Sequence, residues 1–201
     1  MRRAPWRNEE NCANFAELRA RYLVGVDYVV ETRPGDLRLF VVAPHGRIIE
    51  PGTETIARAI AGSDFSLRVF EGIRPRANPK LHIRSTDYDQ PDALRLVALC
   101  KTAIGIHGLG SDIKGDEKVR MGGLNLDFKG KVAAALRKAQ FKAIDAPAGL
   151  DATSPDNICN RAAEHGVQLE LPPELRKRLC SEAALMAQFV AAVRNGMGVA
   201  Q

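Results

Sequence analysis

Two of the four histidines in this chain follow apolar segments that have the composition of buried strands. His45 comes directly after LRLFVVAP, and His107 ends the segment AIGIH. Runs of Val, Ile and Leu of this length favour strands. Ligands of an open α/β sheet bind beyond the carboxyl ends of its strands, so we expect both imidazoles at one edge of a sheet. From spacing alone, each could instead be a hydrogen-bonded structural residue.

A carboxylate follows the first of these histidines closely. Glu50 lies five positions after His45 in PHGRIIEPGTE, near the expected start of a helix. Two imidazoles and one carboxylate form a catalytic zinc ligand set, because three protein ligands leave the fourth position for water or substrate. His45, Glu50 and His107 are therefore candidate ligands of one zinc ion. Alternatively, Glu50 only stabilises the helix N-terminus through the helix dipole.

A metal-dependent hydrolase also needs a base that does not bind the metal, to take a proton from water and return it to the leaving group. Glu170 lies within the apolar segment VQLEL. An unpaired buried charge is costly, so an acid at this position is expected to face a polar site. Glu170 is the candidate general base, although an edge strand could also turn it toward solvent.

Strands and helices that alternate along the chain must position these residues. The segments with strand composition are 22–31, 37–43, 67–72, 103–108, 141–147 and 167–172. Helical spacing of apolar residues occurs at 53–61, 91–101 and 126–140, in a short helix within 154–166, and in the tail from 173. This alternation predicts a single three-layer α/β domain over residues 1–201, with a mixed, mainly parallel sheet and helices on both faces.

Three details of this domain are also expected. The turn sequence RPGD at 33–36 predicts that the first two strands are neighbours in the sheet. Residues 73–91 contain several prolines and are expected to form an extended surface loop. We expect residues 1–20 to be flexible and the apolar residues of the tail to pack on the core.

Composition restricts the class of partner. The net charge of +5 favours an anionic partner, but one Trp, three Tyr and no recognised motif argue against nucleic acid. No apolar stretch reaches the roughly 18 residues of a membrane helix, and no signal peptide is recognisable, so we expect a soluble protein made in the cytoplasm. Its four cysteines form no CxxC pair and are expected to be free thiols.

Six sequence blocks in order resemble the poly-γ-glutamate hydrolase family of phages and bacilli. They are PHGRIIEPGTETIARAIAG, FEGIRPRANPKLHIRSTDYDQP, IHGLG, MGGLN, SPDNICN and GVQLEL, and they cover about residues 25–175. The resemblance implies a zinc carboxypeptidase-like fold with one zinc ion. It places the ligands at His45, Glu50 and His107 and the general base at Glu170. The implied reaction is endo-type hydrolysis of γ-glutamyl amide bonds in a bacterial capsule polymer.

The resemblance also implies substrate contacts. Arg74, Asn78 and His82 lie in its second block and would supply donors to a polymer that carries a carboxylate on every residue. The family usually has a glycine-rich HGGGIE turn, and here Arg47 and the two following isoleucines replace part of it. Arg47 would therefore bind a substrate carboxylate or narrow the cleft. The arginines could instead be solvated loop charges.

Two other functions remain open on the sequence. The same metal chemistry could act on γ-glutamyl bonds of peptidoglycan or on a small acylated amino acid. A catalytically silent module that binds a polyanion could also have kept this fold. The preferred stereochemistry of the polymer, the oligomeric state and the route by which the protein would reach an extracellular substrate do not follow from the residues.

Overall fold

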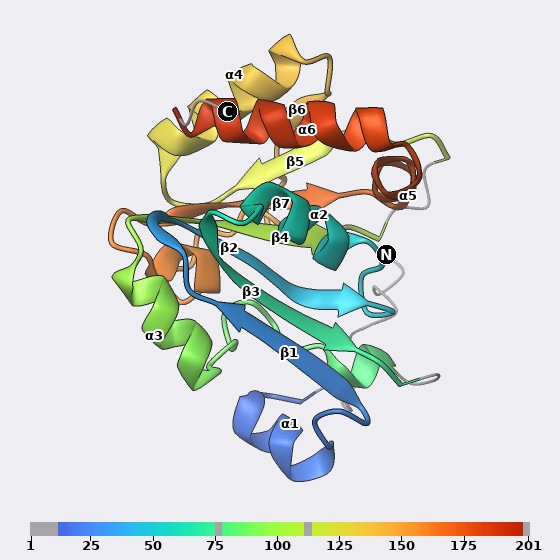
Figure 1. Ribbon diagram of the computed structural model, residues 1–201, viewed down its shortest axis with the longest axis vertical. Helices are drawn as coiled ribbons and strands as arrows, with labels where there is room; N and C mark the ends of the chain where they lie inside the picture. The colour runs from blue at the N-terminus through green and yellow to red at the C-terminus, as the bar shows by residue number, and fades with distance from the viewer. Residues whose placement is uncertain (1–11, 75–77, 111–113, 199–201) are drawn as a thin grey trace.

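A seven-stranded sheet runs through the centre of the structure in the order β1-β3-β2-β4-β7-β5-β6 (Figure 1). The computed structural model describes residues 12–74, 78–110 and 114–198. The strands are β1 (Tyr28–Arg33), β2 (Asp36–Arg47), β3 (Phe65–Gly72), β4 (Thr102–Gly108), β5 (Val119–Gly122), β6 (Ala143–Asp145) and β7 (Gly166–Leu171). Strands β3, β2, β4 and β7 are parallel, whereas β1 and β5 run antiparallel to their neighbours β3 and β7. The predicted mixed, mainly parallel sheet is confirmed.

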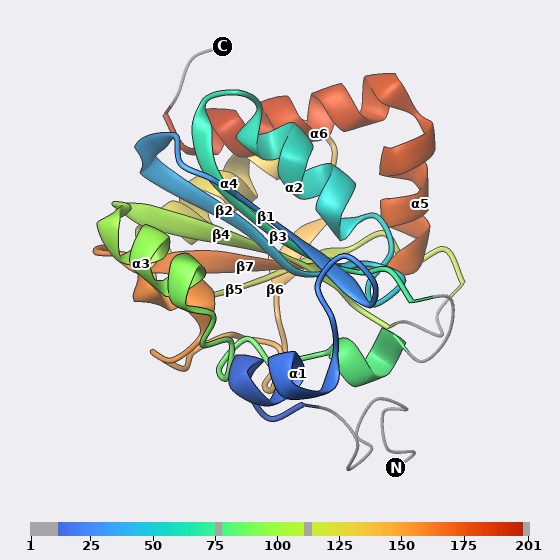
Figure 2. The ribbon, with the colours of Figure 1, turned by 60° about the horizontal axis from the view of Figure 1, so that its bottom comes forward.

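Helices cover both faces of the sheet (Figure 2). The first face carries α2 (Thr53–Ala61), α4 (Leu126–Lys138), α5 (Pro173–Ser181) and α6 (Ala183–Gly196). The second face carries α1 (Phe15–Arg21), α3 (Pro91–Leu99) and the 3-10 turns η1 (Asn78–Leu81) and η2 (Ile158–Arg161). The tail helices bury Leu179 and Phe189 in the first core, as expected from their apolar stripe. The domain is thus a three-layer α/β domain.

The central strands are buried on both sides, which explains their continuous apolar sequences. In β2, Val41 and Ala43 belong to the first core, and Phe40 and Val42 belong to the second. Strand β7 differs, because only its first face is apolar: Val167, Leu169 and Leu171 pack in the first core. The alternate side chains of β7 therefore point to the opposite face, where the second layer leaves room for a polar site.

The predicted pairing of the first two strands is wrong, because β3 lies between β1 and β2. The RPGD turn does not close a hairpin, since its backbone donors bind the start of β3. Gly35 N–H donates to Ser66 Oγ over 3.0 Å, and Asp36 N–H donates to the carbonyl of Asp64 over 2.7 Å. Strand β1 then pairs with β3, for example Tyr28 with Gly72, at the edge of the sheet.

Two further elements were not predicted. Within residues 1–20, which were expected to be flexible, helix α1 begins at Phe15 and buries Phe15 and Leu18. The side chain of its N-cap residue, Asn14, accepts a hydrogen bond from Glu17 N–H. Residues 1–11 lie outside the described part of the chain. Strand β5 has only four residues and pairs with residues 168–170 of β7. In the described parts of the chain, no helix has the length and apolar character needed to cross a membrane.

Arg47 ends β2 in the left-handed region, with a φ of 57°. A non-glycine residue pays about 1–2 kcal/mol for this conformation, and glycine avoids most of that cost. Since the Arg47 side chain is exposed, Arg47→Gly is expected to raise the free energy of unfolding by about 0.5–1 kcal/mol in urea denaturation. Arg38→Gly, at another exposed position of β2, should lower it instead. Equal effects of the two substitutions would show that the left-handed backbone at Arg47 carries no strain.

Candidate metal centre

The register of the sheet brings the three predicted elements of the site to one edge. Val42 of β2 pairs with Gly105 of β4, so His45 and His107 follow this pair at the carboxyl ends of adjacent parallel strands. His107 in turn pairs with Glu170 of β7. The prediction that both imidazoles lie at the carboxyl ends of neighbouring strands is confirmed.

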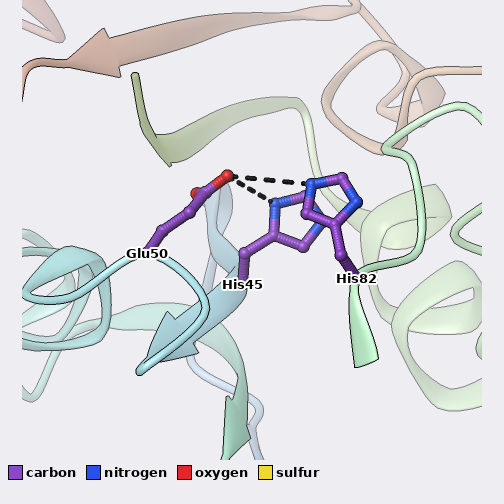
Figure 3. A group of neighbouring side chains, drawn as sticks. All are labelled: His45, Glu50 and His82. Atoms are coloured by element: carbon purple, nitrogen blue, oxygen red, sulfur yellow. Dashed lines mark hydrogen bonds and ion pairs between the residues drawn. The ribbon is translucent and has the colours of Figure 1, made fainter. Parts of the chain in front are cut away.

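Three imidazoles surround the carboxylate of Glu50 (Figure 3 shows two of them). Glu50 Oε1 lies 3.1 Å from His45 Nδ1 and 3.9 Å from His82 Nε2. The other oxygen, Oε2, lies 3.7 Å from His107 Nδ1 and accepts a hydrogen bond from Gly108 N–H over 2.7 Å. The rings of His45 and His82 are stacked, with their centroids 3.9 Å apart.

The hydrogen bonds of His45 and His107 orient their other ring nitrogens toward this carboxylate. His45 Nε2 lies 2.6 Å from the Ile83 carbonyl, so Nε2 carries the proton and Nδ1 is bare. Bare Nδ1 and Glu50 Oε1 are two acceptors in contact, and a cation or a proton must lie between them. His107 Nε2 lies 3.2 Å from Ser85 Oγ, which leaves its Nδ1 facing Glu50. This donor set fits zinc, whose histidine ligands commonly donate their second N–H to a partner.

The structure places His82 in the cluster as well. The donor atoms of His45, Glu50 and His82 all lie within 4.8 Å of one another, and this compact group does not contain His107. His82 reaches the cluster because the described residues 78–91 of the expected surface loop pack against the domain: Leu81 and Ile83 are buried in the second core. The assignment of His107 as third ligand stays a prediction, and His82 is its alternative.

Burial sets the protonation states at this site. It lowers the pKa of His45 to about 4 and that of His82 to about 3, and it holds the pKa of His107 well below 6.5. The imidazoles are therefore neutral at pH 7, the form that binds metals. Burial also raises the pKa of Glu50 to about 7. A bound cation would reverse that shift by favouring the charged carboxylate.

Glu170 stands beside this cluster as a second buried acid. Its side chain is on the second face of β7, and one oxygen, Oε1, accepts a hydrogen bond from Gln168 Nε2 over 2.7 Å. Burial, followed by the nearby charge of Glu50, raises the pKa of Glu170 to about 8. Two acids whose pKa values lie near neutrality in one cleft are typical of proton-transfer sites.

One cleft of about 500 Å³ contains all of these groups. It is lined by His45, Ile49, Glu50, His82, His107, Asn157, Gln168, Glu170, Arg176 and residues 84–86, 108–110 and 149–154. The cleft is open and mixed in polarity, with hydroxyl, amide and backbone groups around the acids. It therefore has the size and the convergent polar groups of a ligand-binding site.

The predicted substrate residues lie in different places. His82 lines the cleft, whereas the lining residues in the described part of the chain do not include Arg47 or Arg74. The Arg74 guanidinium lies 3.2 Å from Asp27 Oδ1 and covers the ring of Tyr22. Asn78 begins η1, but its side chain lies outside what the structure describes. Their roles in substrate binding stay predictions.

Sequence reasoning missed several lining residues. Gln168 could have been found, because VQLEL alternates polar and apolar residues with the period of a half-buried strand. Arg176 comes from α5 and is buried, donating to the carbonyls of Leu171 over 3.0 Å and Pro51 over 2.5 Å. Nothing local in the sequence shows that this arginine returns to the cleft, because its position depends on the packing of α5.

The pKa shifts predict how the stability of the metal-free protein depends on pH. Below pH 6.5, the unfolded chain binds protons on the three histidines that the native state excludes, so stability rises with pH. From pH 4.5 to about 8, the native state keeps protons on Glu50 and Glu170 that the unfolded chain loses, so these two acids oppose the rise. Above pH 6.5, only the two acids contribute to the change of stability with pH. The free energy of unfolding should therefore peak near pH 6.5 and fall by about 1–3 kcal/mol toward pH 8.5.

Urea unfolding with a chelator at pH 5.5, 6.5 and 8.5 measures this dependence. Added zinc should remove the decline above pH 6.5, because the bound cation favours ionised acids. Glu170→Gln should show a smaller decline than the wild type. Metal-free stability that keeps rising up to pH 8.5 would contradict the raised pKa values of both acids.

The site consists of neutral imidazoles around one carboxylate, with a second acid beside them at the carboxyl edge of a parallel sheet. The chain is therefore an α/β protein with a candidate metal centre. The model of the poly-gamma-glutamate hydrolase family matches residues 12–191. The chain therefore belongs to that hydrolase family. The match includes α1 and α5, which lie outside the six blocks recognised in the sequence.

Relatives of known sequence and structure agree with this assignment. The SPbeta prophage-derived UPF0714 protein YoqZ of Bacillus subtilis (strain 168) is 33% identical over 187 residues, which are 92% of this chain and 64% of YoqZ. UPF0714 protein YndL of the same strain is 31% identical over 188 residues, 90% of this chain and 71% of YndL. The chain thus spans less than two thirds of YoqZ.

Two solved structures share the fold over nearly their whole length. The structure of a bacteriophage poly-gamma-glutamate hydrolase superposes with a TM-score of 0.86 at 28% identity, covering 93% of this chain and 96% of that chain. A zinc-free apo structure of YndL gives a TM-score of 0.83 at 27% identity with the same coverage.

Proposed function

We propose that this protein hydrolyses γ-glutamyl amide bonds of poly-γ-glutamate with one zinc ion. Family membership and the similarity to a bacteriophage poly-gamma-glutamate hydrolase support the substrate. The observation that carries the proposal is the contact of a bare imidazole nitrogen of His45 with a Glu50 oxygen, in the same cleft as Glu170. The similarity to YndL, which has been solved as a zinc-free apo structure, supports zinc as the metal.

Each residue of the centre has a role in this proposal. His45, Glu50 and His107 hold the ion, with the N–H groups of the two imidazoles fixed by Ile83 and Ser85. When bound, zinc makes water a stronger acid and polarises the scissile carbonyl. Glu170 takes the proton of the attacking water and returns it to the leaving amine, as a general base and then a general acid.

Arg176 adds a fixed positive charge to this site. Two backbone carbonyls hold its guanidinium, so the charge cannot move away from the acids. The charge of Arg176 opposes the effect of burial on the pKa of both Glu50 and Glu170. It therefore favours the ionised carboxylates that binding a metal and accepting a proton require.

Purified protein mixed with high-molecular-weight poly-γ-glutamate tests the proposal. Viscosity should fall early, new amino groups should appear, and a chelator should stop both until zinc is added back. A protein that binds zinc stoichiometrically and leaves the polymer intact would refute the proposed substrate. Cleavage of γ-glutamyl bonds only in peptidoglycan fragments or in small acylated amino acids would assign the same centre to a different substrate.

Substrate binding by Arg74, Asn78, His82 and Arg47 is part of the proposal, and Arg74 tests it best. Arg74→Gln should weaken binding of poly-γ-glutamate by about two- to five-fold at low salt, and by less at high salt, because salt screens exposed charges. The matched control is Arg38→Gln, which removes a more exposed arginine that pairs with Asp36 at the start of β2. Equal salt dependence in the two variants would show that Arg74 has a structural role and no role in binding the polymer.

A further inference from the structure

A chain of buried amide groups leads from the backbone of η2 to the carboxylate of Glu170. Cys159 N–H donates to Asn157 Oδ1 over 3.1 Å. Asn157 Nδ2 donates to Gln168 Oε1 over 2.9 Å, and Gln168 Nε2 donates to Glu170 Oε1 over 2.7 Å. Asn157, Gln168 and Glu170 are at most 6% exposed, so water competes little for these bonds.

The backbone donor fixes the direction of the whole chain. Oxygen and nitrogen of a side-chain amide are nearly indistinguishable in electron density, and their assignment depends on the surrounding hydrogen bonds. Here the N–H of Cys159 can only donate, so the atom of Asn157 that faces it must be the oxygen. The Asn157 nitrogen then faces Gln168, whose oxygen must face it in turn. Gln168 therefore presents its nitrogen, a donor, to Glu170 Oε1.

A donor at Oε1 differentiates the two oxygens of the carboxylate. The carbonyl oxygen of a protonated carboxyl group is a better acceptor than its hydroxyl oxygen, so the Gln168 N–H at Oε1 favours the proton on Oε2. The bond is also stronger when the carboxylate is charged. Gln168 and Glu170 are two residues apart on the same face of β7, and Asn157 is the residue that caps the start of η2. The Gln168 side chain is thus fixed by Asn157, which lies outside β7.

We propose that Gln168 and Asn157 are positioning residues for Glu170. They keep Oε1 occupied as an acceptor and leave Oε2 as the only oxygen that exchanges a proton with water. This inference rests on the proposed function only through the role of Glu170. The orientation of the two amides can be tested without any activity.

Neutron diffraction from deuterated, metal-free crystals tests the orientation directly. Two deuterons should appear on the Gln168 atom nearest Glu170, and two on the Asn157 atom nearest Gln168. An oxygen of Gln168 facing Glu170 would overturn the inference, whatever the enzyme does with its substrate.

Two substitutions test the consequence for turnover on poly-γ-glutamate. Gln168→Met keeps the length of the side chain and removes the donor, and kcat should fall by about 10- to 100-fold, as expected for a lost hydrogen bond to a charged group. KM and the bound zinc should stay close to wild type.

Asn157→Asp keeps the acceptor for Cys159 N–H but removes the donor to Gln168. The amide of Gln168 then turns over, its oxygen faces Glu170, and kcat should fall at least as far.

The double variant separates positioning from general loss of stability. If Asn157 acts through Gln168, then Asn157→Asp should change kcat by less than about two-fold in the Gln168→Met background, because interacting residues are not additive. Independent structural damage would lower kcat by the same factor in both backgrounds and would overturn the inference.

The matched control is Asn160→Asp. Asn160 is a buried asparagine of η2 whose amide donates to the carbonyls of Ala152 and Ser154. It should lower thermal stability without a comparable loss of kcat.

These outcomes distinguish the inference from the proposed function. A wild type without hydrolytic activity would refute the proposed function, and the neutron result would still decide the orientation of the amides. An active wild type whose kcat is unchanged by both Gln168→Met and Asn157→Asp would refute the positioning role alone.

Discussion

Replacing Glu170 by Gln is expected to lower kcat on poly-γ-glutamate by about 10²- to 10⁴-fold, the usual contribution of a general acid–base group. The amide has nearly the shape of the acid but cannot accept the proton of the attacking water. Because Glu170 is not among the predicted ligands, the variant should bind zinc with wild-type stoichiometry. Metal analysis of the purified protein and steady-state kinetics measure both quantities.

The environment of Glu170 explains the size of this effect. Burial raises its pKa to about 8, and the cations Arg176 and Arg120 act against that rise. A general base works best when its pKa lies near the working pH, so that it can accept a proton and give it back. Zinc in the cleft would lower the pKa of Glu170 further toward neutrality.

Glu164→Gln is the matched control for this substitution. Glu164 is exposed and lies 3.7 Å from Lys101 Nζ, outside the residues that line the cleft. Its replacement should change neither kcat nor zinc content. A Glu170→Gln protein that keeps near-normal rates, or one that has lost its zinc, would show that this carboxylate has a different role.

The part of the site that could be predicted depends on strands. His45 and His107 follow apolar segments, and the carboxyl ends of neighbouring parallel strands meet at one edge, so their proximity follows from the pattern. His82 and Ser85 could not be predicted in the same way. Their position depends on the packing of Leu81 and Ile83 in the second core. Neither the residue spacing nor the proline content of this segment reveals that packing.

The fold shows the same division between local and long-range information. Apolar composition identified most strands and periodicity identified most helices, and the alternation of the two indicated the mainly parallel sheet. Strand order could not be read from the turn sequence, because the backbone donors of Gly35 and Asp36 can close a hairpin or bind another strand. The four-residue strand β5 was missed because so short a segment has no measurable period.

The second large effect is expected from His45. His45→Ala should abolish both zinc binding and turnover, since Nδ1 of His45 lies closer to the Glu50 carboxylate, at 3.1 Å, than a ring nitrogen of His82 or His107 does. The loss of zinc affinity should exceed the about 10- to 100-fold typical of removing only an outer partner of a ligand. Zinc titration monitored by a competing chelator, together with hydrolysis assays at saturating zinc, measures both losses. His165→Ala is the control, because His165 bonds to the Asn160 carbonyl and does not line the cleft.

Alanine variants at the other two imidazoles then identify the third ligand. His107 Nδ1 lies 3.7 Å from one Glu50 oxygen and His82 Nε2 lies 3.9 Å from the other, so distance alone does not separate them. If His107 is the ligand, His107→Ala should lose zinc as His45→Ala does, while His82→Ala keeps zinc and mainly raises KM. The reverse result would replace His107 by His82 in the ligand set and remove His82 from the substrate residues. A His45→Ala protein that still binds zinc tightly would refute the centre itself, because both candidate sets contain His45.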